Sequence, residues 1–141
     1  MEQRFLTNLN HSAVLIEGAR EILEYLSKKY MLCSASNAPE NQQIARLKYS
    51  NIKQYITHQF ISSRIGYNKP DERFFNYCFN IISPIEKEEV VLVGDSLTAD
   101  ILGGINYGIK TIWFNKDNKE NDTTIKPDFI VNKLLELKNI L

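Results

Sequence analysis

Two hydrophobic patterns alternate along most of this chain. Stretches with apolar residues every three or four positions are typical of helices that bury one face, and short runs of consecutive apolar residues are typical of strands covered on both sides. The predicted helices span 19–29, 37–49, 70–82, 97–107 and 133–141, and the predicted strands span 30–35, 58–62, 89–94, 110–114 and 128–131. This alternation predicts an α/β fold in which helices cover a mainly parallel sheet.

The beginning of the chain does not follow this alternation. Phe5, Leu6 and Leu9 have the spacing of a helix, whereas Ile16-Glu17-Gly18 has the character of a linker into the first helix of the α/β unit. We therefore expect residues 1–17 to lie outside the α/β unit, which we place at 18–141.

The composition is that of one globular domain without a charge preference. Of its 141 residues 43% are hydrophobic, and 17 basic residues balance 17 acidic ones. This balance argues against a nucleic-acid partner, and the absence of a long apolar run argues against a membrane span or signal peptide, so we predict a cytoplasmic protein. Cys33 and Cys78 lie in apolar stretches and are expected to be reduced core thiols, and two histidines are too few for a histidine-based metal cluster.

Polar side chains follow three of the predicted strands. Ser36 and Asn37 follow the first, Lys69 lies in the loop after the second, and Asp95 and Asp100 come after the third. Ligands of open parallel sheets bind at the carboxyl ends of the strands. Carboxylates that hold a cation, an ammonium that offsets phosphate charge and a hydroxyl that binds phosphate oxygens would together form an Mg²⁺-dependent phosphoryl-transfer site.

Each of these residues also has a purely structural interpretation. Asn37, with Glu40 three residues later, can form a capping box for the next helix. Lys69 can be a solvated loop lysine, and Asp95 and Asp100 can favour the first turn of the helix that follows them. Only their joint placement after successive strands favours a functional site.

The segment Gly94-Asp95-Ser96-Leu97 spells the GDSL block of a serine esterase family, in which Ser96 would be the nucleophile. Such an enzyme needs a histidine base downstream of the serine. Both histidines of this chain precede Ser96, so we set the esterase interpretation aside.

Three segments, taken together, resemble motifs of the haloacid-dehalogenase-like superfamily of phosphohydrolases. They are the apolar strand that ends in Ser36-Asn37, the Lys69-Pro70 pair, and the apolar strand that ends in Gly94-Asp95-Ser96 with Asp100 a turn later. Within this superfamily, the run from Gly94 to Asn115 is most similar to pyrimidine 5′-nucleotidase-type members.

The resemblance implies a Rossmann-like three-layer sandwich, Mg²⁺ as cofactor and a small phosphorylated metabolite, such as a nucleoside monophosphate, as substrate. It implies that Ser36 and the backbone amide of Asn37 bind the phosphoryl oxygens and that Lys69 balances their charge. Asp95 would ligate Mg²⁺, and Asp100 would complete the acidic site or orient Lys69.

The family's first motif, Asp-x-Asp-x-Thr, is absent from this chain. In the family that motif follows the first central strand of the sheet and supplies the nucleophile. The resemblance therefore implies that residues 1–17 are the remnant of a helical cap domain with its linker, and that 18–141 form the C-terminal part of a core missing its first central strand.

The resulting expectation is a phosphatase that acts through an aspartyl-phosphate in the full-length protein, whereas this chain alone is inactive. The unpaired strand edges could then lead to self-association. The alternatives are a non-catalytic remnant that binds phosphate, metal or a protein, and a phosphorelay receiver domain. The receiver needs an acidic pair where this chain has Ser36-Asn37.

Overall fold

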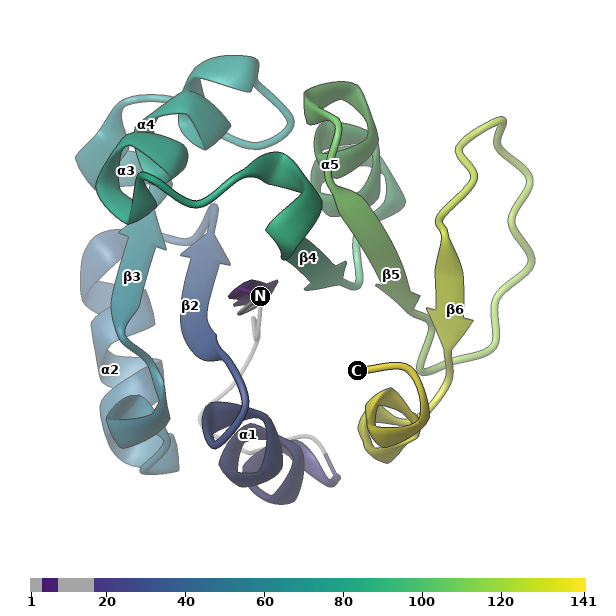
Figure 1. The fold of residues 1–141 in the computed structure, drawn as a ribbon, viewed down its shortest axis with the longest axis horizontal. Helices are drawn as coiled ribbons and strands as arrows, with labels where there is room; N and C mark the ends of the chain where they lie inside the picture. Colours follow the sequence, from purple (N-terminus) through teal and green to yellow (C-terminus); the bar gives the residue numbers. More distant parts are fainter. Residues whose placement is uncertain (1–3, 8–16) are drawn as a thin grey trace.

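The structure, a computed structural model, describes residues 4–7 and 17–141 and has a six-stranded sheet at its centre (Figure 1). All neighbouring strands are parallel, and their order across the sheet is β3-β2-β1-β4-β5-β6. The strands are β1 (Arg4–Thr7), β2 (Met31–Ser36), β3 (His58–Ile61), β4 (Val90–Gly94), β5 (Lys110–Phe114) and β6 (Phe129–Val131). The predicted α/β fold with a parallel sheet is confirmed.

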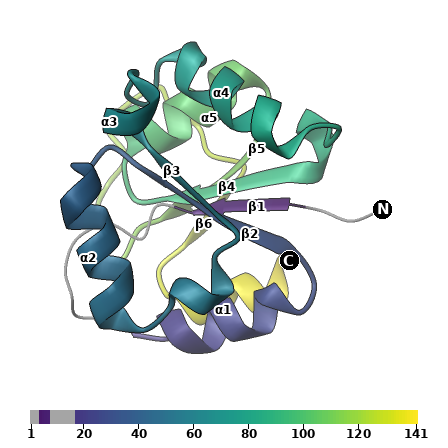
Figure 2. The ribbon, with the colours of Figure 1, turned by 90° about the vertical axis from the view of Figure 1, so that its left-hand side faces the viewer.

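Helices cover both faces of the sheet, which gives the three layers seen edge-on in Figure 2. One layer contains α1 (Ala19–Ser27), α2 (Glu40–Ser50) and the C-terminal 3-10 helix η4 (Leu134–Asn139). The other contains α3 (Ser62–Ile65), α4 (Glu72–Ile82) and α5 (Leu102–Tyr107). Three short turns complete the described elements: η1 (Lys53–Tyr55), η2 (Lys87–Glu89) and the π-helical η3 (Leu97–Ile101).

The strand β4 shows why its sequence is apolar without alternation. Val91 and Val93 pack into the core on the α1 side, whereas Val90 and Leu92 pack into the core on the α4 side. Successive side chains of a strand point to opposite faces, so a strand covered by helices on both faces must be apolar at every position. All five residues of β4 are buried, as this argument requires.

The central position of the sheet is filled by β1. Arg4–Thr7 pairs in parallel with both β2 and β4, so the expected helix through Phe5 and Leu6 is wrong, as is the expectation that β2 and β4 are left unpaired. The physical reason is that the inner edges of β2 and β4 carry backbone donors and acceptors, which an intervening strand satisfies. Leu9 lies outside the described residues, and the origin of 1–17 as a cap remnant stays a prediction.

The start of α2 also differs from the sequence-based expectation. Pro39 occupies the N-cap position and no side chain caps the helix, so the capping box expected from Asn37 and Glu40 is wrong. Both side chains are engaged elsewhere, Asn37 with the backbone of Lys69 and Glu40 with Arg64. The side chains of Asn37 and Glu40 thus bind residues distant in the sequence and do not cap α2.

Cys33 and Cys78 are both buried and not joined in a disulfide, as expected of core thiols. Burial raises the pKa of the Cys78 thiol well above its usual range. Within the described ranges, the helices are too short or too polar to traverse a lipid bilayer.

Candidate functional site

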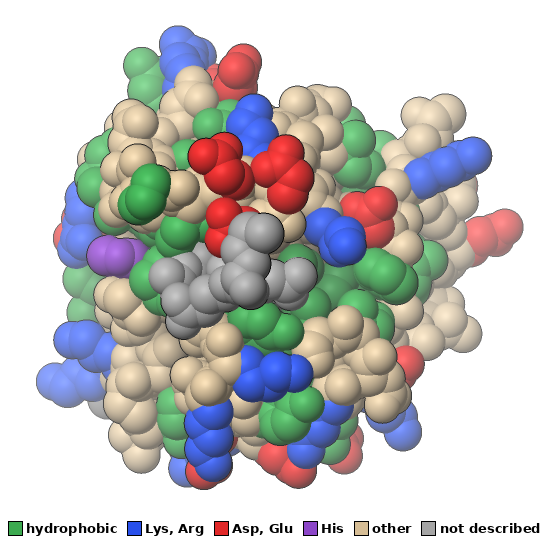
Figure 3. Space-filling view, viewed as in Figure 1, with side chains coloured by type: hydrophobic (Ala, Val, Ile, Leu, Met, Phe, Trp, Pro, Cys, Tyr) green, Lys and Arg blue, Asp and Glu red, His purple; other side chains and the backbone are tan. Residues whose placement is uncertain are grey.

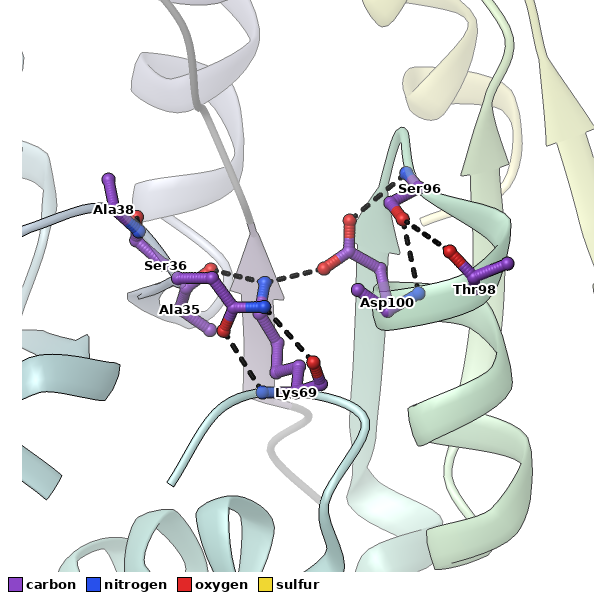
Figure 4. Close-up of polar contacts among 9 residues, drawn as sticks. Ala35, Ser36, Ala38, Lys69, Ser96, Thr98 and Asp100 are labelled. Carbon is purple, nitrogen blue, oxygen red and sulfur yellow. Dashed lines mark hydrogen bonds and ion pairs between the residues drawn. The ribbon is translucent and has the colours of Figure 1, made fainter. Parts of the chain in front are cut away.

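Lys69 is the centre of the candidate site. Its ammonium donates to the backbone carbonyl of Ala35 at 2.8 Å and to Oδ1 of Asp100 at 2.5 Å (Figure 4). The side chains of Lys69 and Asp100 have no solvent exposure. Because Ala35 lies at the end of β2 and Asp100 follows β4, the pair bridges the two strands that flank β1. The site therefore lies at the carboxyl end of the central strand.

Asp100 is held from two sides. While Oδ1 accepts from Lys69, Oδ2 accepts from the backbone N–H of Ser96 at 3.2 Å. The side chain of Asp100 can approach the end of β4 only because residue 94 is a glycine. A methyl group at that position would overlap the side chain of Asp100. The glycine at the end of β4 thus makes room for the buried carboxylate.

Asn37 orients the backbone of Lys69. The Asn37 Oδ1 accepts from the Lys69 backbone N–H at 3.0 Å, and Nδ2 of Asn37 donates to the Lys69 carbonyl at 3.0 Å. This reciprocal pair satisfies both polar groups of the Lys69 residue backbone. The expected role of Asn37 used its backbone amide, whereas the structure adds a positioning role for its side chain.

The two candidate serines act locally as hydrogen-bond acceptors. Oγ of the buried Ser36 accepts from the backbone N–H of Ala38 at 2.9 Å. Oγ of Ser96 accepts from the N–H of Ala99 at 3.1 Å and so caps η3. A hydroxyl that accepts in this way still carries its own O–H donor. Ser36 can therefore present a donor to a phosphate oxygen.

Asp95 directly follows β4 and is held through its backbone. Its carbonyl accepts from the indole N–H of Trp113, which lies on β5, at 3.1 Å. This bond ties the turn after β4 to the neighbouring strand. The side chain of Asp95 is half-buried.

The described part of the chain holds no group of three or more histidine, cysteine or acidic side chains arranged for a metal ion. The available carboxylates are Asp95 and Asp100, of which Asp100 has an N–H donor on each oxygen. Mg²⁺ is commonly bound through one or two carboxylates, with waters and substrate phosphate as the other ligands. Asp95 and Asp100 therefore fit a partial Mg²⁺ site of this kind.

The structure thus brings Lys69 and Asp100 into direct contact and attaches Asn37 to the same loop. Ser36 is the neighbour of Ala35, and Asp95 is the neighbour of Ser96, so all the predicted site residues lie on the segments that meet here. Sequence reasoning missed the carbonyl of Ala35 and the steric role of Gly94. The role of Gly94 could have been suspected from the sequence, because it is a glycine at the end of an apolar strand.

Comparison with known proteins agrees with this geometry. The family described as haloacid dehalogenase-like hydrolase matches residues 2–114. The HAD-hydrolase YfnB of Bacillus subtilis is 36% identical over 141 residues, which are 100% of this chain and 60% of YfnB. Its crystal structure bound to magnesium superposes with a TM-score of 0.89, covering 92% of this chain and 57% of that one.

Two pyrimidine 5′-nucleotidases are also similar along the whole chain. PynA of Streptococcus pneumoniae is 36% identical and YjjG of Escherichia coli 28% identical, each over 100% of this chain. The match covers 62% of PynA and 63% of YjjG, so the chain spans about three fifths of the length of these relatives. From the family match, the shared fold and the site at the end of the central strand, we conclude that the chain belongs to the haloacid dehalogenase-like hydrolase family.

Proposed function

We propose that this chain supplies the phosphate-binding and metal-binding side of an Mg²⁺-dependent phosphatase site. The observation that carries this proposal is the buried Lys69–Asp100 pair at the carboxyl end of the central strand. In the family that strand end carries the Asp-x-Asp nucleophile, which this chain lacks. The full-length protein would form an aspartyl-phosphate there, and this chain alone would not turn over substrate.

Each residue has a defined part in the proposed reaction. The ammonium of Lys69 offsets the negative charge of the nucleophile and the phosphate, while Asp100 keeps that ammonium in place. Ser36 donates its hydroxyl hydrogen to a phosphoryl oxygen, and the backbone N–H of Asn37 serves another. Mg²⁺, when bound through Asp95, supplies further neutralisation of the phosphate charge.

The proposed substrate is a nucleoside 5′-monophosphate. This choice is supported by the names of PynA and YjjG, which are pyrimidine 5′-nucleotidases similar to this chain over its whole length. A cytoplasmic location is part of the same proposal and stems from the sequence alone.

The test is release of inorganic phosphate from uridine monophosphate in the presence of Mg²⁺. The purified chain is assayed alone and together with a polypeptide that carries the family's Asp-x-Asp strand, which would take the place of β1. We expect background release by the chain alone and clear release in the mixture, because attack on phosphorus needs a positioned nucleophile. Phosphate release by the chain alone that survives Asp95→Asn would contradict the proposal. It would favour Ser96 as the nucleophile.

Two controls separate catalysis from assembly. The same polypeptide with its first aspartate replaced by asparagine should bind but restore no release. Lys69→Met in this chain should also abolish release by the mixture, since the phosphate charge is then left without its buried counter-charge. The alternative is a non-catalytic binding protein, and it is supported by the central position of the sheet being filled by β1. A mixture that assembles and binds phosphate without releasing any from the substrate would favour this alternative.

A further inference from the structure

The sheet has an open edge at β3. Within the described ranges β3 pairs with β2 alone, and the backbone N–H of Thr57 donates to the carbonyl of Leu32 at 2.7 Å. Backbone groups of successive residues in a strand point alternately to its two sides. Since the backbone N–H of Thr57 points toward β2, the backbone N–H and C=O groups of His58 and Phe60 point toward the open side.

A groove of about 500 Å³ runs along this open edge, between α2 and α4. Its apolar lining includes Ile44 from α2, with 40% of its surface exposed, and Tyr77 and Ile81 from α4, with 43% and 47% exposed. Aromatic contacts support its floor, because the ring of Phe60 stacks with His58 and meets Tyr77 edge-on. Unpaired backbone and exposed apolar side chains therefore lie side by side.

The charged side chains among the described residues of this groove are all basic. They are Lys48, Lys53 and Arg64, and none of the described residues that line the groove is acidic. Arg64 is paired with Glu40, whereas Lys48 and Lys53 form no ion pair with a described residue. Figure 3 shows basic side chains along the flank where α2 and β3 lie. The groove is thus a local positive site on a chain whose net charge is +0.

We propose that this groove binds an extended acidic segment of a partner protein, which joins β3 as an additional edge strand. The backbone of the segment would pair with His58 and Phe60, its apolar side chains would contact Ile44 and Tyr77, and its carboxylates would face Lys48 and Lys53. Strand addition of this kind takes affinity from the main chain and specificity from alternate side chains.

A second copy of this chain is a poorer occupant. Symmetric pairing of two β3 edges would bring the basic residues of both grooves together, and like charges placed opposite each other across strands are destabilising. Charge complementarity therefore favours a partner rich in aspartate or glutamate.

The first experiment uses the full chain and a short fluorescent peptide of alternating Glu and Val residues, with binding followed by anisotropy. We expect saturable binding that weakens as salt increases, and at least about tenfold lower affinity for the Lys48→Glu/Lys53→Glu variant. The control Lys119→Glu/Lys126→Glu makes the same change in net charge at exposed positions outside the groove and should retain the affinity. Equal losses in both variants, or equal binding of a Lys-Val peptide, would overturn the proposal.

The second experiment tests the backbone contacts. Methylating alternate peptide nitrogens of the Glu-Val peptide removes donors on one edge, and methylation of the edge that faces β3 should abolish binding. Amide NMR shifts of His58 and Phe60 should move on addition of the unmodified peptide. Unchanged binding by both methylated peptides, one for each edge, or self-association of the chain that blocks the groove, would overturn the proposal.

Discussion

The ammonium of Lys69 lies 2.5 Å from Oδ1 of Asp100, and neither side chain is exposed to solvent. Both groups have further hydrogen bonds, to the carbonyl of Ala35 and from the N–H of Ser96. A buried pair of this kind is costly to break, because the remaining charge is left in an apolar environment without a counter-charge. The same contact therefore supports both the fold and the proposed chemistry.

Asp100→Ala and Lys69→Met should each lower the free energy of unfolding by about 3–5 kcal/mol. The double variant Lys69→Met/Asp100→Ala should lose less than the sum of the two single losses, because it leaves no unpaired charge. Urea unfolding of the four proteins gives the coupling energy. Strictly additive losses would show that the two side chains do not depend on each other.

Gly94→Ala should destabilise the chain by about 1–3 kcal/mol, the usual cost of adding atoms to a tightly packed position. The added methyl group would overlap Asp100, so the carboxylate must move away from the backbone N–H of Ser96. Thermal or urea unfolding measures the loss, and the amide NMR signal of Ser96 should shift. An unchanged Ser96 signal with full stability would rule out the steric role.

Asp95→Asn should weaken Mg²⁺ binding more than Asp100→Asn does. Both oxygens of Asp100 accept hydrogen bonds from Lys69 and Ser96, which fits the proposed role of Asp100 in orienting Lys69, while the proposal assigns direct contact with the cation to Asp95. Calorimetric titration with Mg²⁺ compares the variants, with circular dichroism to verify that each is folded. Equal losses, or full affinity in Asp95→Asn, would contradict these roles.

Acid should remove a stabilising contribution of Asp71. Hydrogen bonds from the side chain and then the backbone of Arg73 lower the pKa of Asp71 from 3.8 to about 2. Because the folded-state pKa is the lower one, the contribution is fully present above pH 3.8 and is lost as the pH falls toward about 2.

This loss is measured as the stability difference between the chain and its Asp71→Asn variant, by urea unfolding at several pH values. Asparagine can still cap α4 but does not titrate, so the difference should shrink across this acidic range. A difference that stays constant from neutral pH to pH 2 would contradict the lowered pKa of Asp71.

The candidate site could be predicted from the sequence because its residues follow segments with a clear strand pattern. The apolar run of β4 ends directly before Asp95, and parallel strands meet at one edge, so Lys69 and Asp100 could be placed together. The resemblance left open whether Asp100 orients Lys69, and the bond from Lys69 to the carbonyl of Ala35 could not be predicted, because both contacts depend on side-chain positions set by the packed core.

The central strand shows where local patterns stop being informative. The four residues of β1 are compatible with a helix as well as a strand, and their state is decided by β2 and β4, which are distant in the sequence. Asn37 gives the same lesson on a smaller scale. Its sequence context predicts a helix cap, whereas its side chain pairs with the backbone of Lys69.

The bond from Trp113 to the Asp95 carbonyl gives the molecule an intrinsic optical probe. Trp113 is the chain's single tryptophan, only 5% of its surface is exposed, and its indole N–H is the donor in that bond. Tryptophan emission from this protein therefore comes from one place, which is hydrogen-bonded to the backbone of the residue proposed to hold the cation. We expect binding of Mg²⁺ at the proposed site to change this emission, so that fluorescence can follow the binding without any label or substitution.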